Sequence, residues 1–161
     1  MSRRWIFLLK FVGLLILFEV PLLIPAVDQN VVRPVSAWIA AAAAVVLRGL
    51  RQHLVVNGTV LSSSCIAVNI QNGCNGLETV LFLLAAVLAF PASAARKATA
   101  AVAGLLLIEA VNLIRVVTLY LIGCYRPQWF AAFHLAIWQT IVFATAVVFF
   151  AAWSRRAVAS A

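Results

Sequence analysis

Long apolar runs constrain this chain more than any other feature of its sequence. Five stretches are composed almost entirely of hydrophobic residues; they cover about residues 5–27, 35–50, 77–95, 98–124 and 127–153. About 20 residues in a helix suffice to cross the hydrocarbon core of a bilayer. Hydrophobic residues make up 66% of the 161 residues and charged residues 10%, far less charge than a soluble domain carries. We therefore predict one integral-membrane domain over residues 1–161, folded as an all-α polytopic bundle.

Seven of the twelve basic residues lie at or near the ends of these runs. They are Arg3, Arg4, Lys10, Arg96, Lys97, Arg155 and Arg156. Because Lys and Arg accumulate in cytoplasmic loops, this pattern predicts that both termini and the turn at 96–97 face the cytoplasm of a bacterial inner membrane. The net charge is +8, but the cations do not cluster with aromatic residues on one face. The charge therefore indicates orientation in a lipid membrane and not nucleic-acid binding.

The N-terminus is predicted to lie in the cytoplasm and Cys74 on the outer side, so the chain must cross the membrane an odd number of times before Cys74. If residues 5–27 cross outward and residues 77–95 cross back inward, the stretch between them stays on the outer side. Residues 35–50 form a short, alanine-rich run that contains Arg48 and is followed by Arg51. We therefore predict a partial or interfacial helix there, and about four full transmembrane helices in the rest of the chain.

Residues 53–73 have a different character from the apolar runs. They contain β-branched residues on both sides of Asn57-Gly58, a dipeptide typical of hairpin turns. Polar residues follow at 62–64 and 69–72. We predict a short extracytoplasmic segment that can form β-structure.

Polar residues inside a membrane are costly and are usually paired or functional. Cys74 lies in Asn72-Gly73-Cys74-Asn75-Gly76, a turn-forming sequence followed at once by an apolar helix. A thiol at a helix N-terminus has a lowered pKa and forms a thiolate more readily. The local pattern is equally compatible with a small buried residue in a helix cap.

Two further polar residues fall near the same leaflet as Cys74. Arg115 lies in the outer half of its helix, with Asn112 one turn earlier, and His134 lies near the outer start of the last helix. Taken singly, Arg115 is also compatible with a structural pair with Glu109 or Glu19, and His134 with an interfacial histidine. A thiol, a base and a fixed cation on three consecutive helices are the groups needed for acyl transfer.

Other functions remain open at this point. Cys65 and Cys124 have no comparable setting, and the odd number of cysteines leaves at least one thiol outside any intramolecular disulfide. A single Cys and a single His do not make a metal site, so we expect neither a metal nor another cofactor. The alternative is a non-catalytic membrane scaffold or assembly factor, in which the arginine and glutamate residues form structural pairs and Cys74 is a helix cap.

Three sequence blocks resemble the exosortase/archaeosortase family, and in particular the short H-type exosortases. The blocks are Asn72-Gly73-Cys74-Asn75-Gly76-Leu77-Glu78, Asn112-Leu113-Ile114-Arg115-Val116-Val117, and Pro127-Gln128-Trp129-Phe130 leading to His134. Their order and spacing fit the family, and the resemblance covers roughly residues 5–155. The chain departs from the family pattern at Gln139, where a glutamate is expected, so no carboxylate role is assigned to that position.

The resemblance implies a multispanning cysteine transpeptidase whose site faces the extracytoplasmic side. Its substrates would be exported proteins with a C-terminal sorting signal, which consists of a short motif, a membrane helix and a basic cluster; H-type signals are of the Ile-Pro-Thr-Leu kind. Cys74 would be the nucleophile, Arg115 the arginine of the site and His134 the histidine. We expect four further residues to support the site or contact the substrate, namely Asn72, Asn75, Glu78 and Asn112.

Overall fold

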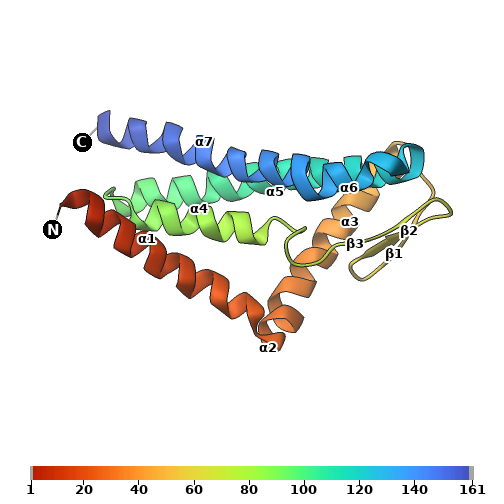
Figure 1. Cartoon of the computed structure of the whole chain (residues 1–161), viewed down its shortest axis with the longest axis horizontal. Helices are drawn as coiled ribbons and strands as arrows, with labels where there is room; N and C mark the ends of the chain where they lie inside the picture. The colour runs from red at the N-terminus through yellow and green to blue at the C-terminus, as the bar shows by residue number, and fades with distance from the viewer. Residues whose placement is uncertain (1, 160–161) are drawn as a thin grey trace.

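The computed structural model describes residues 2–159 and is predominantly helical (Figure 1). Its long helices are α1 (Arg3–Glu19), α3 (Arg33–Gly49), α4 (Leu77–Ala89), α5 (Ala94–Tyr125) and α7 (Trp138–Ala159). Two short helices, α2 (Pro25–Val27) and α6 (Phe130–Ala132), lie at bends in the chain. One antiparallel sheet has the order β1 (Val55–Asn57), β2 (Val60–Ser62) and β3 (Ala67–Asn69). The predicted all-α membrane bundle with a small β segment is confirmed.

Four helical stretches in the described residues are long and apolar enough to cross a membrane. They are Arg4–Leu23, Pro25–Gly49, Ala94–Tyr125 and Pro127–Ala157. Four is also the predicted number of long helices, but residues 35–50, predicted to form the short partial helix, lie within one of these stretches, and the short apolar helix is α4 instead. Helix α4 has only 13 residues, or about 20 Å, because Gly76 is left-handed before it and Phe90 is extended before Pro91 after it.

The helix predicted to be partial is longer than the sequence indicated. It begins at Pro25 and continues through a π-helical turn at Asp28–Val32 into α3. Figure 1 shows α3 running away from the end of the molecule where both termini and the α4–α5 turn lie, toward the end where the sheet lies. Helix α3 therefore carries the chain to the sheet without bringing it back to the end of the molecule where the N-terminus lies. This agrees with the odd number of crossings predicted before Cys74.

Two apolar clusters hold the fold together. One cluster joins α3, the sheet and α5, and contains Ala40, Ala43, Ala44, Leu47, Leu61, Ile70, Val116, Val117 and Tyr120. The other joins α4, α5 and α7, and contains Leu83, Val87, Ala100, Ile108, Val142 and Ala146. Small residues on α3 let its backbone approach α5 closely. The segment between Ile70 and α4, which carries Cys74, therefore lies at the junction of the two clusters.

A disulfide links the sheet to the C-terminal end of α5. Cys65 follows β2 and pairs with Cys124 in the last turn of α5, with a Cα–Cα distance of 5.1 Å. Gly123 makes room for this link, because a side chain there would overlap Ile66. Neither Cys65 nor Cys124 is therefore a free thiol, and Cys74 is the free cysteine of the described chain.

Candidate active site

Cys74 lies in a tight turn between β3 and α4. The backbone N–H of Cys74 donates to the carbonyl oxygen of Gln71 at 2.9 Å, and the glycines on either side adopt left-handed conformations, with φ of +80° at Gly73 and +77° at Gly76. A residue other than glycine adopts these angles only with strain. The sequence Gly73-Cys74-Asn75-Gly76 therefore fixes the thiol in a position set by the turn rather than by the helix.

Three side chains from separate parts of the chain meet at this turn. The Cys74 Sγ lies 3.9 Å from the His134 Nε2 and 3.9 Å from the Arg115 Nη2. Arg115 also donates from Nη1 to the carbonyl oxygen of Gly73 at 3.3 Å. All three predicted residues thus line one cavity of about 210 Å³. The arrangement brings a thiol, an imidazole and a guanidinium together at one cavity.

Arg115 is almost completely buried, with 3% of its surface exposed. The alternative interpretation expected a structural ion pair with Glu109 or Glu19. Within residues 2–159, the polar contacts of this guanidinium are instead the Gly73 carbonyl oxygen and the Cys74 sulfur. A guanidinium cannot lose its proton, so Arg115 presents a fixed positive charge to the thiol.

His134 lies in a π-helical turn, Phe133–Ile137, that precedes α7. Such turns often occur at functional sites, because they reorient a side chain relative to a regular helix. The imidazole stacks on the ring of Phe130 with the ring centroids 5.6 Å apart. Stacking holds the imidazole in the cavity with its Nε2 toward the thiol.

The environment of Cys74 corrects one prediction made from the sequence. Burial raises the pKa of the Cys74 thiol; the nearby Arg115 lowers it, and the carboxylate of Glu78 raises it further. A helix N-terminus was expected to lower the pKa of this thiol. It does not, because α4 begins only at Leu77, three residues after Cys74. The resting group is therefore a neutral thiol that needs a base to become a nucleophile.

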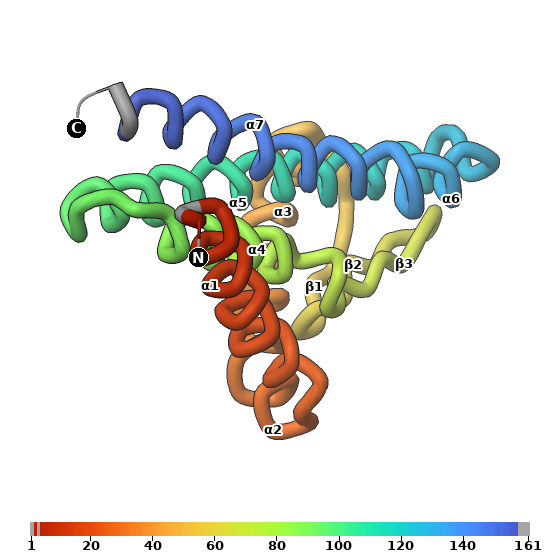
Figure 2. Tube along the Cα trace, turned by 60° about the vertical axis from the view of Figure 1, so that its left-hand side comes forward, coloured from red at the N-terminus to blue at the C-terminus, as the bar shows by residue number. Residues whose placement is uncertain are grey.

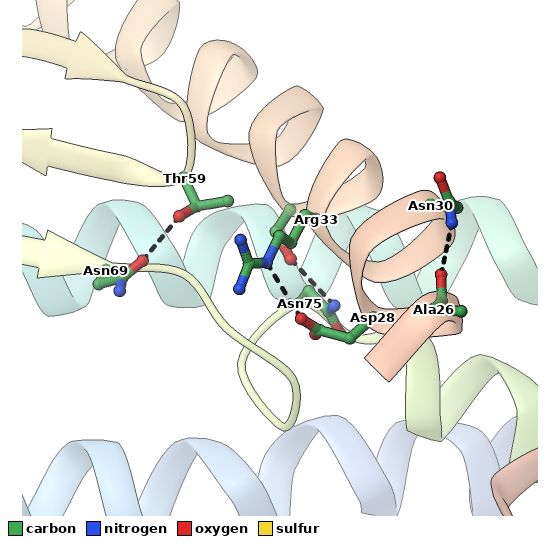
Figure 3. A network of polar contacts seen from close by, with 8 residues as sticks. Ala26, Asp28, Asn30, Arg33, Thr59, Asn69 and Asn75 are labelled. Atoms are coloured by element: carbon green, nitrogen blue, oxygen red, sulfur yellow. Dashed lines mark hydrogen bonds and ion pairs between the residues drawn. The ribbon is translucent and has the colours of Figure 1, made fainter. Parts of the chain in front are cut away.

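The four residues expected to support the site occupy different places around it. Asn75 is fully buried, and its amide nitrogen donates to Ser36 on α3 at 3.1 Å (Figure 3). Its oxygen accepts from the backbone N–H of Leu77 at 3.1 Å. It therefore ties the turn to two helices. Asn72 is half-buried in the same turn, and Glu78 lies in the first turn of α4.

Asn112 is also fully buried. It lies beneath Gly76, where a Cβ atom would come within 3.2 Å of the Asn112 side chain and 3.0 Å of the Glu109 carboxylate. The turn therefore meets α5 at Asn112, about 20 Å along the helix from its C-terminal end at Tyr125. The site is recessed below that end of α5.

We predict that Gly76→Ala lowers activity at least about tenfold, because a left-handed alanine is strained by about 1–2 kcal/mol and its Cβ would push the turn away from Asn112. Cleavage of substrate per folded molecule measures the effect. Gly58→Ala is the matched control: Gly58 also has a positive φ, of +57°, but a Cβ atom at that position would meet no neighbouring atom within 4 Å. Equal losses in both variants would contradict a specific role for the Gly76 turn.

Sequence reasoning identified the three central residues but missed others that shape the cavity. Phe130 orients His134, and β3 together with Ile70 forms one wall. In residues 2–159, no group of three or more His, Cys, Asp or Glu side chains is arranged to hold a metal ion.

A known protein family matches almost the whole chain. The family model described as transmembrane exosortase matches residues 1–152, a range that includes every residue of the candidate site. No curated protein and no solved structure matches the chain.

Proposed function

The chain belongs to the transmembrane exosortase family, and we propose that it is a membrane-embedded cysteine transpeptidase that cleaves the C-terminal sorting signal of exported proteins. Family membership supports a transpeptidase-like role in the membrane. One observation carries the finer proposal. A single free thiol lies 3.9 Å from both an imidazole nitrogen and a guanidinium nitrogen, in one cavity.

Activation of the thiol is the first step of the proposed mechanism. The Nε2 of His134 accepts the proton of the Cys74 thiol, because burial keeps that thiol neutral at rest. Arg115 then stabilises the thiolate through its positive charge. The imidazolium formed in this step holds the proton that the leaving group needs later.

Acylation follows from the same geometry. The thiolate attacks a peptide carbonyl carbon of the sorting signal, and Arg115 stabilises the negative charge that develops on the carbonyl oxygen. His134 donates its proton to the amide nitrogen, the C–N bond breaks, and the C-terminal part of the signal leaves as an amine. The exported protein remains bound to Cys74 as a thioester.

Transfer to an acceptor completes the reaction. An amine or hydroxyl group of the acceptor attacks the thioester carbonyl while His134 removes its proton. The C–S bond breaks, the new amide or ester leaves, and the proton returns to the Cys74 sulfur. The chemistry consumes no oxidant and no metal.

We further propose that the site faces the extracytoplasmic side of the inner membrane. The Cys65–Cys124 disulfide lies at the end of the molecule that carries the sheet. Disulfides persist in the periplasm and are rare in the reducing cytoplasm. The basic residues at both termini and at Arg96 and Lys97 favour the cytoplasm for the opposite end. These two independent signals support one orientation.

This orientation predicts a labelling pattern in intact cells. In a background carrying Cys74→Ser, we expect an impermeant maleimide to modify Asn57→Cys in the β-hairpin and to leave Lys97→Cys unmodified until the membrane is permeabilised. Asn57 is exposed at the sheet end, and Lys97 lies at the other end, in the first turn of α5. Labelling of position 97 without labelling of position 57 contradicts the orientation.

The raised pKa of Cys74 predicts a pH dependence for a variant without the base. His134→Ala should be almost inactive at neutral pH, and its rate should rise about tenfold per pH unit until the pKa of the thiol is passed, since only the thiolate attacks. Cleavage of a synthetic sorting-signal peptide by purified protein between about pH 7 and 10 measures this rise across the ordinary thiol range. His53→Ala is the control, because His53 is exposed and lies outside the cavity. A flat profile for His134→Ala argues against its role as the base.

Co-expression tests the function as a whole. An exported protein carrying an Ile-Pro-Thr-Leu sorting signal is produced with the wild type or with Cys74→Ser, and its C-terminal mass is measured. The proposal expects C-terminal shortening with the wild type only. Retention of the full-length C-terminus in both strains argues against this substrate class.

A further inference from the structure

The cavity beside Cys74 has the free edge of the sheet as one wall. Strand β3 lies at the edge of the sheet order β1-β2-β3, and residues 67–70 line the cavity together with Cys74, Arg115 and His134. Figure 2 shows β3 as the strand nearest to α6, with β1 on the far side of the sheet. The open edge of the sheet and the nucleophile therefore belong to one site.

The hydrogen bonds of β3 determine which backbone groups face this edge. Ser63 donates its N–H to the carbonyl oxygen of Ile66, and Ile70 donates to that of Thr59, each at 2.9 Å. In an antiparallel pair, hydrogen-bonded and non-bonded residue pairs alternate along the strand. Residues 66, 68 and 70 therefore turn their backbone groups toward β2, and residues 67 and 69 turn theirs away from it.

Ala67 and Asn69 thus present N–H and C=O groups along the free edge. Both residues are exposed, whereas Val68 packs into the core beside its partner Leu61. The Asn69 side chain accepts a hydrogen bond from the Thr59 hydroxyl at 2.8 Å (Figure 3), which holds the end of β3 near the Cys74 turn. The edge is fixed and ready to pair with an extended chain.

We propose that the substrate's sorting-signal segment binds as an added β-strand along the free edge of β3, with hydrogen bonds to the backbone of Ala67 and Asn69. This inference rests on the proposed transpeptidase function. Strand β3 leads through Ile70 directly into the turn that carries Cys74, so a chain paired with β3 is directed past the thiol. Apolar residues of the facing wall, Leu119 and Phe130, are available to contact its side chains.

This mode of binding explains how a small cavity can select an extended peptide. Main-chain hydrogen bonds give affinity that depends little on sequence, and pockets for alternate side chains give specificity. The extended conformation also exposes the scissile carbonyl group to a nucleophile at the end of the strand. The edge therefore positions the substrate, and the residues of β3 take no part in the chemistry.

Ala67→Pro tests the inference, since proline removes the edge-facing N–H of residue 67 without altering a bond to β2. Its matched control is Val56→Pro. Residues 60 and 62 turn their backbone groups toward β1, so the Val56–Leu61 pair between them is not hydrogen-bonded. The N–H of Val56 therefore faces the other free edge of the sheet, outside the cavity. Both variants lose one edge donor, but only Ala67→Pro loses one beside Cys74.

We expect Ala67→Pro to lower kcat/KM for a synthetic Ile-Pro-Thr-Leu peptide by at least about tenfold, mainly through KM. The rate of Cys74 alkylation by iodoacetamide should stay at the wild-type value, which shows that the turn is intact. Val56→Pro should stay within about twofold of the wild type, a change below that of one hydrogen bond. Cleavage by Ala67→Pro with wild-type efficiency overturns the inference.

A second experiment uses the wild-type protein with altered peptides, so its result does not depend on whether a variant folds. Amide groups of the peptide other than the scissile bond and the Ile–Pro bond, whose nitrogen carries no hydrogen, are replaced one at a time by esters, which removes a single N–H each time. Because alternate residues of a strand face its partner, we expect losses of about three- to tenfold at every second position. Uniform losses, or none, overturn the inference even if Ala67→Pro does not accumulate.

Cys74→Ala, assayed in parallel, separates this inference from the proposed function. An inactive Cys74→Ala together with fully active Ala67→Pro overturns strand addition and leaves the cysteine mechanism standing. Cleavage by Cys74→Ala at the wild-type rate overturns the cysteine mechanism itself.

Discussion

Replacement of Cys74 with alanine is expected to abolish processing of an exported substrate completely. The described chain has no other free thiol, because Cys65 and Cys124 are joined in a disulfide. No other group is therefore available to form the thioester. Cys74→Ser should be nearly as inactive, since a hydroxyl is a far weaker nucleophile than a thiolate and the base in contact with it would be a single imidazole. The substrate's C-terminal mass after co-expression measures both variants.

The control for this prediction is a double variant, Cys65→Ser with Cys124→Ser. It removes both other sulfur atoms and leaves the cavity residues in place, so it should retain activity per folded molecule. It should also be less stable: in the chain-entropy description, a disulfide that closes a loop of this length contributes up to about 4 kcal/mol. An inactive but well-folded double variant, combined with cleavage by Cys74→Ala, contradicts the choice of Cys74 as nucleophile.

The convergence of Cys74, Arg115 and His134 was predictable because it depends on topology alone. The positions of the basic residues predict which ends of the helices share a leaflet, and this prediction places the three residues near the same leaflet on three consecutive helices. The structure adds the distances, and also the left-handed glycines that hold the thiol between β3 and α4. The hairpin at Gly58 was predictable for a different reason: the Asn-Gly pair that forms the turn is a local sequence signal.

The identity of the short helix was not predictable from hydropathy. Residues 77–95 form a nearly continuous apolar run, but the helix ends at Ala89 because the residue before Pro91 avoids the helical conformation. Conversely, residues 25–34 appear too polar for a helix, with Asp28, Asn30 and Arg33. In the structure Arg33 pairs with Asp28 at 3.0 Å, and Asn30 donates to the carbonyl oxygen of Ala26 (Figure 3). Local polar contacts within the helical segment therefore accommodate these residues.

The state of the thiol was mispredicted because a helix N-terminus acts only over its first turn. Cys74 precedes Leu77 by three residues, and its own backbone N–H is bonded within the turn. Burial then outweighs the charge of Arg115 and raises the pKa of Cys74. The raised pKa keeps the thiol protonated at neutral pH, so the proposed mechanism needs a base, and it gives that role to His134.

Arg115→Lys is expected to lower the rate of cleavage by about 100- to 1000-fold, the typical loss for one oxyanion donor. Lysine keeps the positive charge, but it lacks the planar group that can bind two acceptors together. In the structure Nη1 donates to the Gly73 carbonyl oxygen while Nη2 points at the sulfur. A single ammonium group cannot hold the turn and also stabilise the developing oxyanion. The loss should appear in kcat measured with a synthetic sorting-signal peptide.

The alkylation rate of Cys74 distinguishes this role from simple stabilisation of the thiolate. Because lysine preserves the charge that lowers the pKa of Cys74, Arg115→Lys should react with iodoacetamide at nearly the wild-type rate. Arg115→Ala removes that charge and should react more slowly. Arg126→Lys is the matched control, since Arg126 is exposed and does not line the cavity. If Arg115→Lys loses alkylation and cleavage in the same proportion, Arg115 acts only on the thiolate, and stabilisation of the oxyanion must come from another group.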